Sequence, residues 1–255
     1  KAIRDEYDPY GGRAIGSREM LDIREAEYGG EMLYINKSAH HPMWAMEYSR
    51  DEGLRKYWDE YSYPYHKEGA GPLYRGKDAS DYNHNQDMLA VENIRRWFDY
   101  WQERPGTGTR ISSGGVKIIF SDTNTHFRGE ENYRRSGVTD AMRIPKDAFY
   151  AHQVMWDGWV DIEQPRIHII GHWNYKEDVI KPVYVVSGAD KVELFLNGKS
   201  LGEGEREYHF LYTFKDVQFE TGKLEAIGYD ETGKECCRTE LQTAGRNQTD
   251  FCSEP

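Results

Sequence analysis

Two hydrophobic patterns divide the chain, and the first covers about 160 residues. Short apolar runs alternate there with a segment whose apolar residues recur every three or four positions, the spacing of an amphipathic helix. This segment predicts a helix from Gln86 to Arg104, which Pro105-Gly106 ends. Its apolar positions are Ala90, Ile94, Trp97, Phe98 and Trp101.

Three apolar runs in the same part predict strands. They are Arg13–Ser17, Met43–Met46, which stops at Glu47, and Val116–Phe120, which stops at Ser121-Asp122. Strands that alternate with helices are typical of βα units. We therefore expect a parallel sheet in this part of the chain.

From about Lys181 onward the helical period disappears. Short runs with period-2 alternation are separated by the turn residues Asn197-Gly198, Thr221-Gly222 and Asp230–Gly233. They predict strands at Val183–Ser187, Val192–Leu196, Tyr208–Phe214, Leu224–Tyr229 and Glu235–Leu241. This pattern favours a small all-β module, with an immunoglobulin-like sandwich as its form. The polar residues after Ala244 predict a loose tail.

Composition and charge exclude several classes of protein. The chain has 255 residues, with 33 Lys and Arg against 44 Asp and Glu, a formal net charge of −11. This balance argues against a nucleic-acid partner, because phosphate binding needs clustered cations. No apolar run reaches the roughly 18–20 residues that span a bilayer, so we expect no membrane segment. The 7 Trp, 19 Tyr and 9 Phe indicate a folded chain.

Glu47 is the sharpest candidate for chemistry. It ends an apolar strand and is flanked by Tyr48 and Arg50. In (β/α) barrels the carboxyl ends of the strands carry the catalytic groups. The alternative is that Glu47 caps the next helix or pairs with Arg50.

A second set of polar side chains follows the next strand. Asp122, Asn124 and His126 could hydrogen-bond hydroxyls, or could organise the loop that follows. Farther on, Trp156 and Trp159 could stack on sugar rings or pack between domains, and for Trp159 we favour packing.

Metal and nucleotide sites are not predicted. His40-His41 are adjacent, and His168 and His172 are four apart but in a strand-like stretch, so neither pair matches a helical metal pair. Gly198-Lys199-Ser200 lacks the first glycine of a phosphate loop and is interpreted as a hairpin. We expect no metal and no cofactor.

Several of these segments resemble glycoside hydrolase family 2, the retaining β-galactosidases and β-glucuronidases. Asp8-Pro9 to Ile15 resembles the turn and strand after the family's acid/base strand. Pro42 to Tyr48 resembles the seventh barrel strand, whose terminal Glu is the family nucleophile, and Val116–Asp122 would be the eighth. Pro145–Tyr150 followed by Trp156 resembles the last barrel helix. Val192–Gly202 (VELFLNGKSLG) is similar to a hairpin of the β-sandwich that follows this barrel.

The resemblance implies the C-terminal half of a TIM barrel over residues 1–160, an immunoglobulin-like sandwich over 161–243 and a loose tail over 244–255. It implies Glu47 as nucleophile and Tyr28 as a hydroxyl that hydrogen-bonds it, while Glu25, Glu27, Glu31 and Glu52 are rival carboxylates and Tyr28 could equally be a core tyrosine. Asp122, Asn124 and Trp156 would then bind substrate.

Two departures from the family pattern matter. Ser49 stands where the family has Gly or Ala, which bears on the substrate. The family's acid/base is the Glu of an Asn-Glu pair, and this sequence contains no such pair. We therefore expect that residue upstream of Lys1, in a missing N-terminal part, and expect the piece alone to be inactive.

The implied function is hydrolysis of a β-linked glycan, first of all a β-galactoside. A β-glucuronidase, a β-mannosidase and a non-catalytic carbohydrate-binding module stay open as alternatives, as does a homo-oligomer. The resemblance also suggests a periplasmic or secreted protein.

Overall fold

The computed structural model describes residues 1–16, 27, 29–31, 42–48, 61, 86–102, 111–117, 119–123 and 137–245. The chain divides into two compact units. The first unit comprises Lys1–Asp51 and Arg95–Phe120, and the second comprises Glu52–Ile94 and Ser121–Pro255. No helix in these described ranges is long and apolar enough to cross a membrane.

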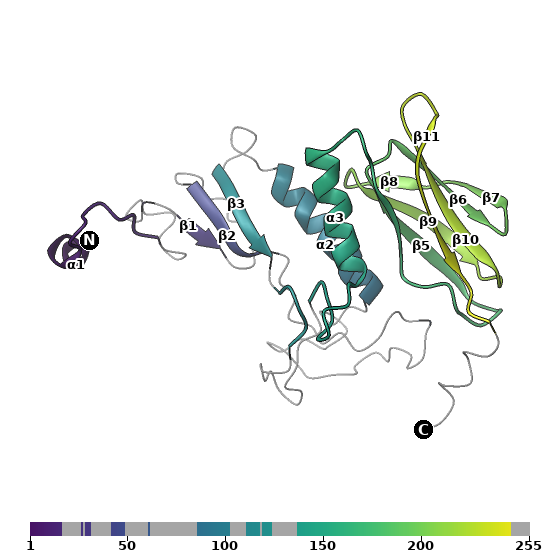
Figure 1. Cartoon of the computed structure of the whole chain (residues 1–255), viewed down its shortest axis with the longest axis horizontal. Helices are drawn as coiled ribbons and strands as arrows, with labels where there is room; N and C mark the ends of the chain where they lie inside the picture. Colours follow the sequence, from purple (N-terminus) through teal and green to yellow (C-terminus); the bar gives the residue numbers. More distant parts are fainter. Residues whose placement is uncertain are drawn as a thin grey trace, which may run out of the picture. The chain divides into compact units, whose positions relative to one another are not determined.

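The first unit contains a parallel sheet. Its strands are β1 (Gly29–Glu31), β2 (Pro42–Tyr48) and β3 (Ile111–Lys117), in the order β1-β2-β3, and both pairs are parallel (Figure 1). The short helix α1 (Ala2–Tyr7) precedes them. The parallel sheet expected from the sequence is thereby confirmed.

Two strand predictions in this unit need correction. The strand predicted at Val116–Phe120 begins earlier, at Ile111, and ends at Lys117, while Phe120 is 60% exposed. The first residues of β3 include Ser112–Gly115, which offer no apolar side chains, yet their backbone pairs with β2. Ladder hydrogen bonds come from the backbone, so such a segment forms a strand without a hydrophobic signal. Residues 13–16 form no strand beyond an isolated bridge at Gly16.

Of the two long helices, α2 (Gln86–Gln102) was predicted from its hydrophobic pattern, and α3 (Asp147–Val160) lies where the resemblance implied a helix. Helix α2 buries Leu89, Ala90, Val91, Ile94 and Trp97, and this stripe confirms the prediction. Helix α3 buries Ala148, Ala151, Val154 and Met155, again at three- and four-residue spacing. It packs against β4 and β5 of the second unit.

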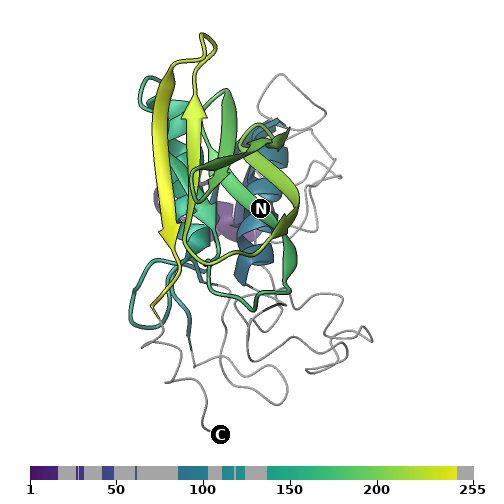
Figure 2. The ribbon, with the colours of Figure 1, turned by 90° about the vertical axis from the view of Figure 1, so that its right-hand side faces the viewer.

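The second unit contains two antiparallel sheets of four strands among its described residues (Figure 2). One has the order β4-β5-β9-β8 and the other β11-β10-β6-β7. The strands are β4 (Ile167–Ile170), β5 (Ile180–Ser187), β6 (Lys191–Leu196), β7 (Lys199–Glu203), β8 (Glu205–Glu207), β9 (Leu211–Gln218), β10 (Lys223–Tyr229) and β11 (Glu235–Gln242). Both sheets contribute side chains to one core, which includes Trp173, Tyr212, Leu194 and Leu224. The arrangement is a β-sandwich.

Two turns of the sandwich test the hairpin and one of the strands that the sequence predicts. Asn197 (φ 53°) and Gly198 (φ 80°) form the tight hairpin between β6 and β7, which confirms the hairpin prediction. The strand predicted at Tyr208–Phe214 is partly wrong, because Tyr208 (φ 47°) and His209 (φ 63°) form a turn and β9 begins at Leu211. Positive φ at two successive bulky residues is not visible in a hydrophobic pattern.

A buried ion pair joins the first turn of α2 to the sandwich. Lys181 Nζ on β5 lies 3.5 Å from Asp87 Oδ2 and donates a 2.9 Å hydrogen bond to the Tyr175 hydroxyl. The ammonium also lies over the ring of Tyr175, 4.8 Å from its centroid. Gly171 (φ 97°) leaves room for the carboxylate, because a Cβ there would lie 2.8 Å from Asp87 Oδ2.

The predicted tail is described only at its start. The Ala244 N–H donates a 2.7 Å hydrogen bond to Asn174 Oδ1, and residues 246–255 lie outside the described residues. The domain boundary predicted at residues 160 and 161 stays a prediction.

Candidate active site

Glu47 is the penultimate residue of β2, at the carboxyl end of a parallel strand. The last pair between β1 and β2 joins Glu31 to Ala45. β2 therefore continues past the end of β1 through Met46, Glu47 and Tyr48. In barrels of parallel strands, such ends are where catalytic groups are carried.

The pairing of β2 with β3 is irregular at this point. Ala45 pairs with Gly115 and Tyr48 pairs with Lys117, so three steps along β2 match two along β3. The extra residue falls at Met46–Glu47. β-Bulges of this kind occur next to active sites, where they redirect a side chain or end the pairing.

One rival carboxylate, Glu27, is committed to structural donors. It accepts a 2.8 Å hydrogen bond from the Ile15 N–H and hydrogen bonds of 3.1 and 3.2 Å from Arg4 Nη1. The backbone N–H of Ile15, followed by the Arg4 guanidinium, lowers the pKa of Glu27 below its ordinary value. Glu27 thus holds α1 to the segment that follows it. Glu25 and Glu52 lie outside the described residues.

Asp122 organises a loop. Its Oδ1 accepts hydrogen bonds from the Gly137 N–H (2.9 Å) and from Lys146 Nζ (2.9 Å), and its Oδ2 lies 3.0 Å from the same ammonium. Its backbone N–H donates to Thr139 O at 3.0 Å. Of the two roles open from the sequence, these contacts support loop organisation, and a sugar contact stays a prediction.

Trp156 and Trp159 lie in the part of the chain that the structure describes. Trp156 lies on α3 and is 58% exposed. Trp159, on the same helix, stacks on His209 (centroids 5.7 Å apart) and meets Phe210 edge-on, so the preference for packing is confirmed. Tyr28 and Asn124 lie outside the described residues.

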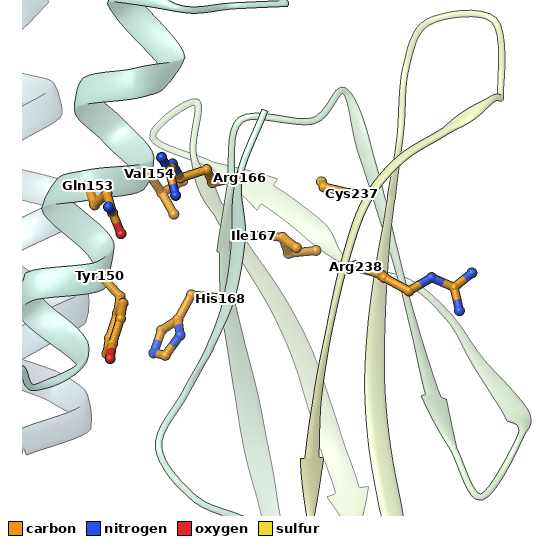
Figure 3. Close-up of a pocket in the computed structure, with 8 residues that line it drawn as sticks. All are labelled: Tyr150, Gln153, Val154, Arg166, Ile167, His168, Cys237 and Arg238. Carbon is orange, nitrogen blue, oxygen red and sulfur yellow. The ribbon is translucent and has the colours of Figure 1, made fainter. Parts of the chain in front are cut away.

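A groove of about 450 Å³ lies in the second unit, between α3 and the strands β4 and β11 (Figure 3). Its lining residues are Tyr150, Gln153, Val154, Arg166, Ile167, His168, Cys237 and Arg238. It contains neither Asp122 nor Trp156. No three His, Cys, Asp or Glu side chains of the described ranges gather as a metal site.

Two lining residues, Tyr150 and His168, form a chain of contacts with Asp147 that the sequence did not predict. His168 Nε2 lies 2.8 Å from Asp147 Oδ1, and the His168 ring stacks on Tyr150 (centroids 4.6 Å apart, planes at 25°). The sequence places Tyr150 only in the segment Pro145–Tyr150, which resembles the last barrel helix. Asp147 and His168 are 21 residues apart, so only the fold brings them together.

The chain is similar in sequence to one domain family and to several named proteins. A family model described as a domain of unknown function, DUF4982, matches residues 178–237, within the sandwich. The chain is 32% identical to a beta-glucuronidase of Formosa agariphila, over 93% of this chain and 23% of that protein. It is 33% identical to beta-galactosidase BoGH2A of Bacteroides ovatus, over 43% of this chain and 12% of that protein.

A solved structure extends the likeness to the fold. The structure of a beta-glucuronidase from glycoside hydrolase family 2 matches 96% of this chain with a TM-score of 0.68 and 28% identity. The match takes up 25% of that protein, so the chain spans about a quarter of the length of these two glucuronidases. The fold of nearly the whole chain is therefore similar to that of part of this beta-glucuronidase. The chain belongs to glycoside hydrolase family 2.

Proposed function

We propose that this chain is part of a retaining β-glycosidase in which Glu47 is the nucleophile. The observation that carries the proposal is the place of Glu47, at a break in the ladder at the carboxyl end of a parallel strand. In barrel enzymes the catalytic residues lie at the carboxyl ends of the strands, and Glu47 occupies such a position. The structural role of Glu27 removes one rival.

The chemistry follows from two carboxyl groups about 5–5.5 Å apart. The Glu47 carboxylate attacks the anomeric carbon and forms a covalent glycosyl-enzyme, while an acid protonates the leaving oxygen. Water then releases the sugar with retained configuration, and the acid acts as a base in that step. In this proposal the acid/base residue precedes Lys1 in a longer protein, where residues 1–160 form the second half of a TIM barrel and 161–243 an immunoglobulin-like sandwich.

The remaining predicted site residues have supporting roles in the proposal. The Tyr28 hydroxyl hydrogen-bonds Glu47 and keeps it ionised, since a donor to a carboxylate favours the charged form. Asn124 and Asp122 contact sugar hydroxyls, and Trp156 offers its exposed indole to a sugar ring.

Among substrates, we propose a β-linked glucuronide. Its support is the relative from Formosa agariphila and the family 2 structure, both of which are beta-glucuronidases. A β-galactoside, which the family resemblance favoured, is the second candidate. Its support is that the relative from Bacteroides ovatus is a beta-galactosidase. Paired assays with aryl β-glucuronides and aryl β-galactosides separate the two.

The test of the nucleophile uses matched variants of the longer protein. Glu47→Gln removes the attacking carboxylate with little change in shape, so kcat should fall ~10³-fold or more. Glu27→Gln removes a carboxylate of the same unit and should leave kcat nearly unchanged. Equal losses in both variants would contradict the assignment, and an active Glu47→Gln enzyme would overturn it. No hydrolysis by the parent protein of either glycoside, with binding retained, would favour the non-catalytic module.

A further inference from the structure

The groove beside α3 has a lining that differs from the rest of the chain. The sequence contains 44 Asp and Glu residues, yet none of the eight lining residues is acidic, and two are arginines. The lining also offers aromatic rings, an amide and apolar side chains. A volume of about 450 Å³ lies within the range of small-ligand sites.

The aromatic part of the groove is held rigidly. Asp147 is 7% exposed and uses both carboxylate oxygens, one toward His168 Nε2 (2.8 Å) and one as acceptor from the Gly171 N–H (3.1 Å). The oriented imidazole supports one face of Tyr150. Tyr150 remains 37% exposed, so the ring has surface available for a ligand. A fixed aromatic ring loses little conformational entropy when a ligand packs on it.

The groove lining also contains the polar side chains of Gln153 and Arg166. Gln153 lies three residues after Tyr150 on α3, which places both on one helix face. Arg166, just before β4, faces them, and its Nε donates to Asp157 Oδ2. That contact uses Nε, and the two Nη groups lie at the far end of the planar guanidinium. Figure 3 shows Arg238 pointing away from α3, so its head group takes no part here.

We infer that this groove is a second glycan site, which binds one acidic pyranose of a β-linked oligosaccharide away from the bond that is cleaved. The apolar face of the sugar packs on Tyr150, the Gln153 amide hydrogen-bonds hydroxyls, and the Arg166 guanidinium pairs with the uronate carboxylate. The inference rests on the proposed function for its choice of ligand, since it assumes that the protein meets an acidic glycan.

Binding to the 255-residue chain tests this inference without catalysis. Isothermal titration calorimetry is carried out with a β-linked tetraglucuronide and with a neutral β-galactotetraose. The chain should bind the acidic oligosaccharide at least about tenfold more tightly than the neutral one, because only the former offers a carboxylate to Arg166. Equal affinity for both, or no binding of either, would overturn the inference.

Variants assign the binding to the groove. Tyr150→Ala should weaken binding about tenfold, the value of one aromatic contact. Gln153→Leu keeps a helix-forming residue of similar size and should weaken it as well. Tyr7→Ala, which removes a 71% exposed tyrosine of α1 outside the groove, is the control and should bind as the wild type does. Binding that Tyr7→Ala abolishes, while Gln153→Leu leaves it intact, would refute the site.

The proposed catalytic role of Glu47 and the proposed binding at the groove can be tested independently. Glu47→Gln should retain full affinity for the tetraglucuronide in the chain, whatever its effect on hydrolysis in the longer protein. If Glu47→Gln abolishes this binding, the oligosaccharide is held at the catalytic strand and the groove assignment is wrong.

Discussion

Lys181 gives the sharpest stability prediction, because its charge is buried with that of Asp87. Each side chain is 5% exposed, and the ammonium is also held by the Tyr175 hydroxyl at 2.9 Å. Lys181→Met keeps a long side chain but removes the ammonium that lies 3.5 Å from the buried Asp87 carboxylate. Removal of one partner from a buried pair costs about 3–5 kcal/mol. We expect a loss of this size in the free energy of unfolding, measured by urea denaturation of the chain at pH 7.

Two further proteins make this experiment decisive. The double variant Lys181→Met/Asp87→Leu removes both charges, and should recover most of the loss because apolar pairs replace buried ion pairs at little cost. Lys215→Met breaks an exposed pair with Glu205, whose side chains are 69% and 58% exposed, and should leave the urea midpoint unchanged. A loss below about 1 kcal/mol for Lys181→Met, or a double variant as unstable as the single one, would refute the reasoning.

Three other predictions concern single contacts. Burial raises the pKa of Tyr212 from 10.0 to about 12, so its protonated form stabilises the fold below pH 10 and this contribution is lost as the pH rises toward 12. Tyr212→Phe should therefore flatten the fall in unfolding free energy between pH 10 and 12, and should cost about 1–3 kcal/mol at pH 7, because Ala189 O loses the 2.6 Å hydrogen bond from the hydroxyl. An unchanged alkaline profile would contradict this. Asp122→Ala should lower the free energy of unfolding by about 1–3 kcal/mol, since Lys146 and the Gly137 N–H lose their acceptor; an unchanged urea midpoint would leave Asp122 only a role in binding. Gly137→Ala should lower the melting temperature, because its Cβ would lie 2.5 Å from the Asp122 backbone nitrogen; a melting temperature equal to that of the wild type would show that the loop relaxes freely.

Elements with a strong side-chain period were predictable from the sequence. Helix α2 follows from the spacing of Ala90, Ile94 and Trp97, and the hairpin between β6 and β7 follows from Asn197-Gly198. The start of β3 was not predictable, since Ser112–Gly115 carry no hydrophobic signal and pair through the backbone. Strand β4, in which Ile169 and Ile170 are buried, was recognised only as a strand-like stretch around His168 and was not among the predicted strands. It is four residues long, too short for its period to stand out.

The candidate site was likewise predictable from the sequence only in part. Glu47 was predictable because an apolar run stops there, but the irregular pairing around it depends on the register of β3. The contacts of Asp122 with Gly137 and Lys146 join residues 15 and 24 positions apart, and those of Asp147 with His168 span 21. No local pattern in a single sequence encodes such pairs, because they arise only when the chain folds.

Covalent labelling of the longer protein tests the central claim most directly. A 2-deoxy-2-fluoro-β-glucuronide with an activated leaving group should form a glycosyl-enzyme that hydrolyses slowly, because the fluorine destabilises the positively charged transition state. Peptide mass spectrometry should locate one sugar on Glu47, and Glu47→Gln should take up no label. A label on Glu25, Glu31 or Glu52, or an unlabelled enzyme that releases product of inverted configuration, would contradict the account.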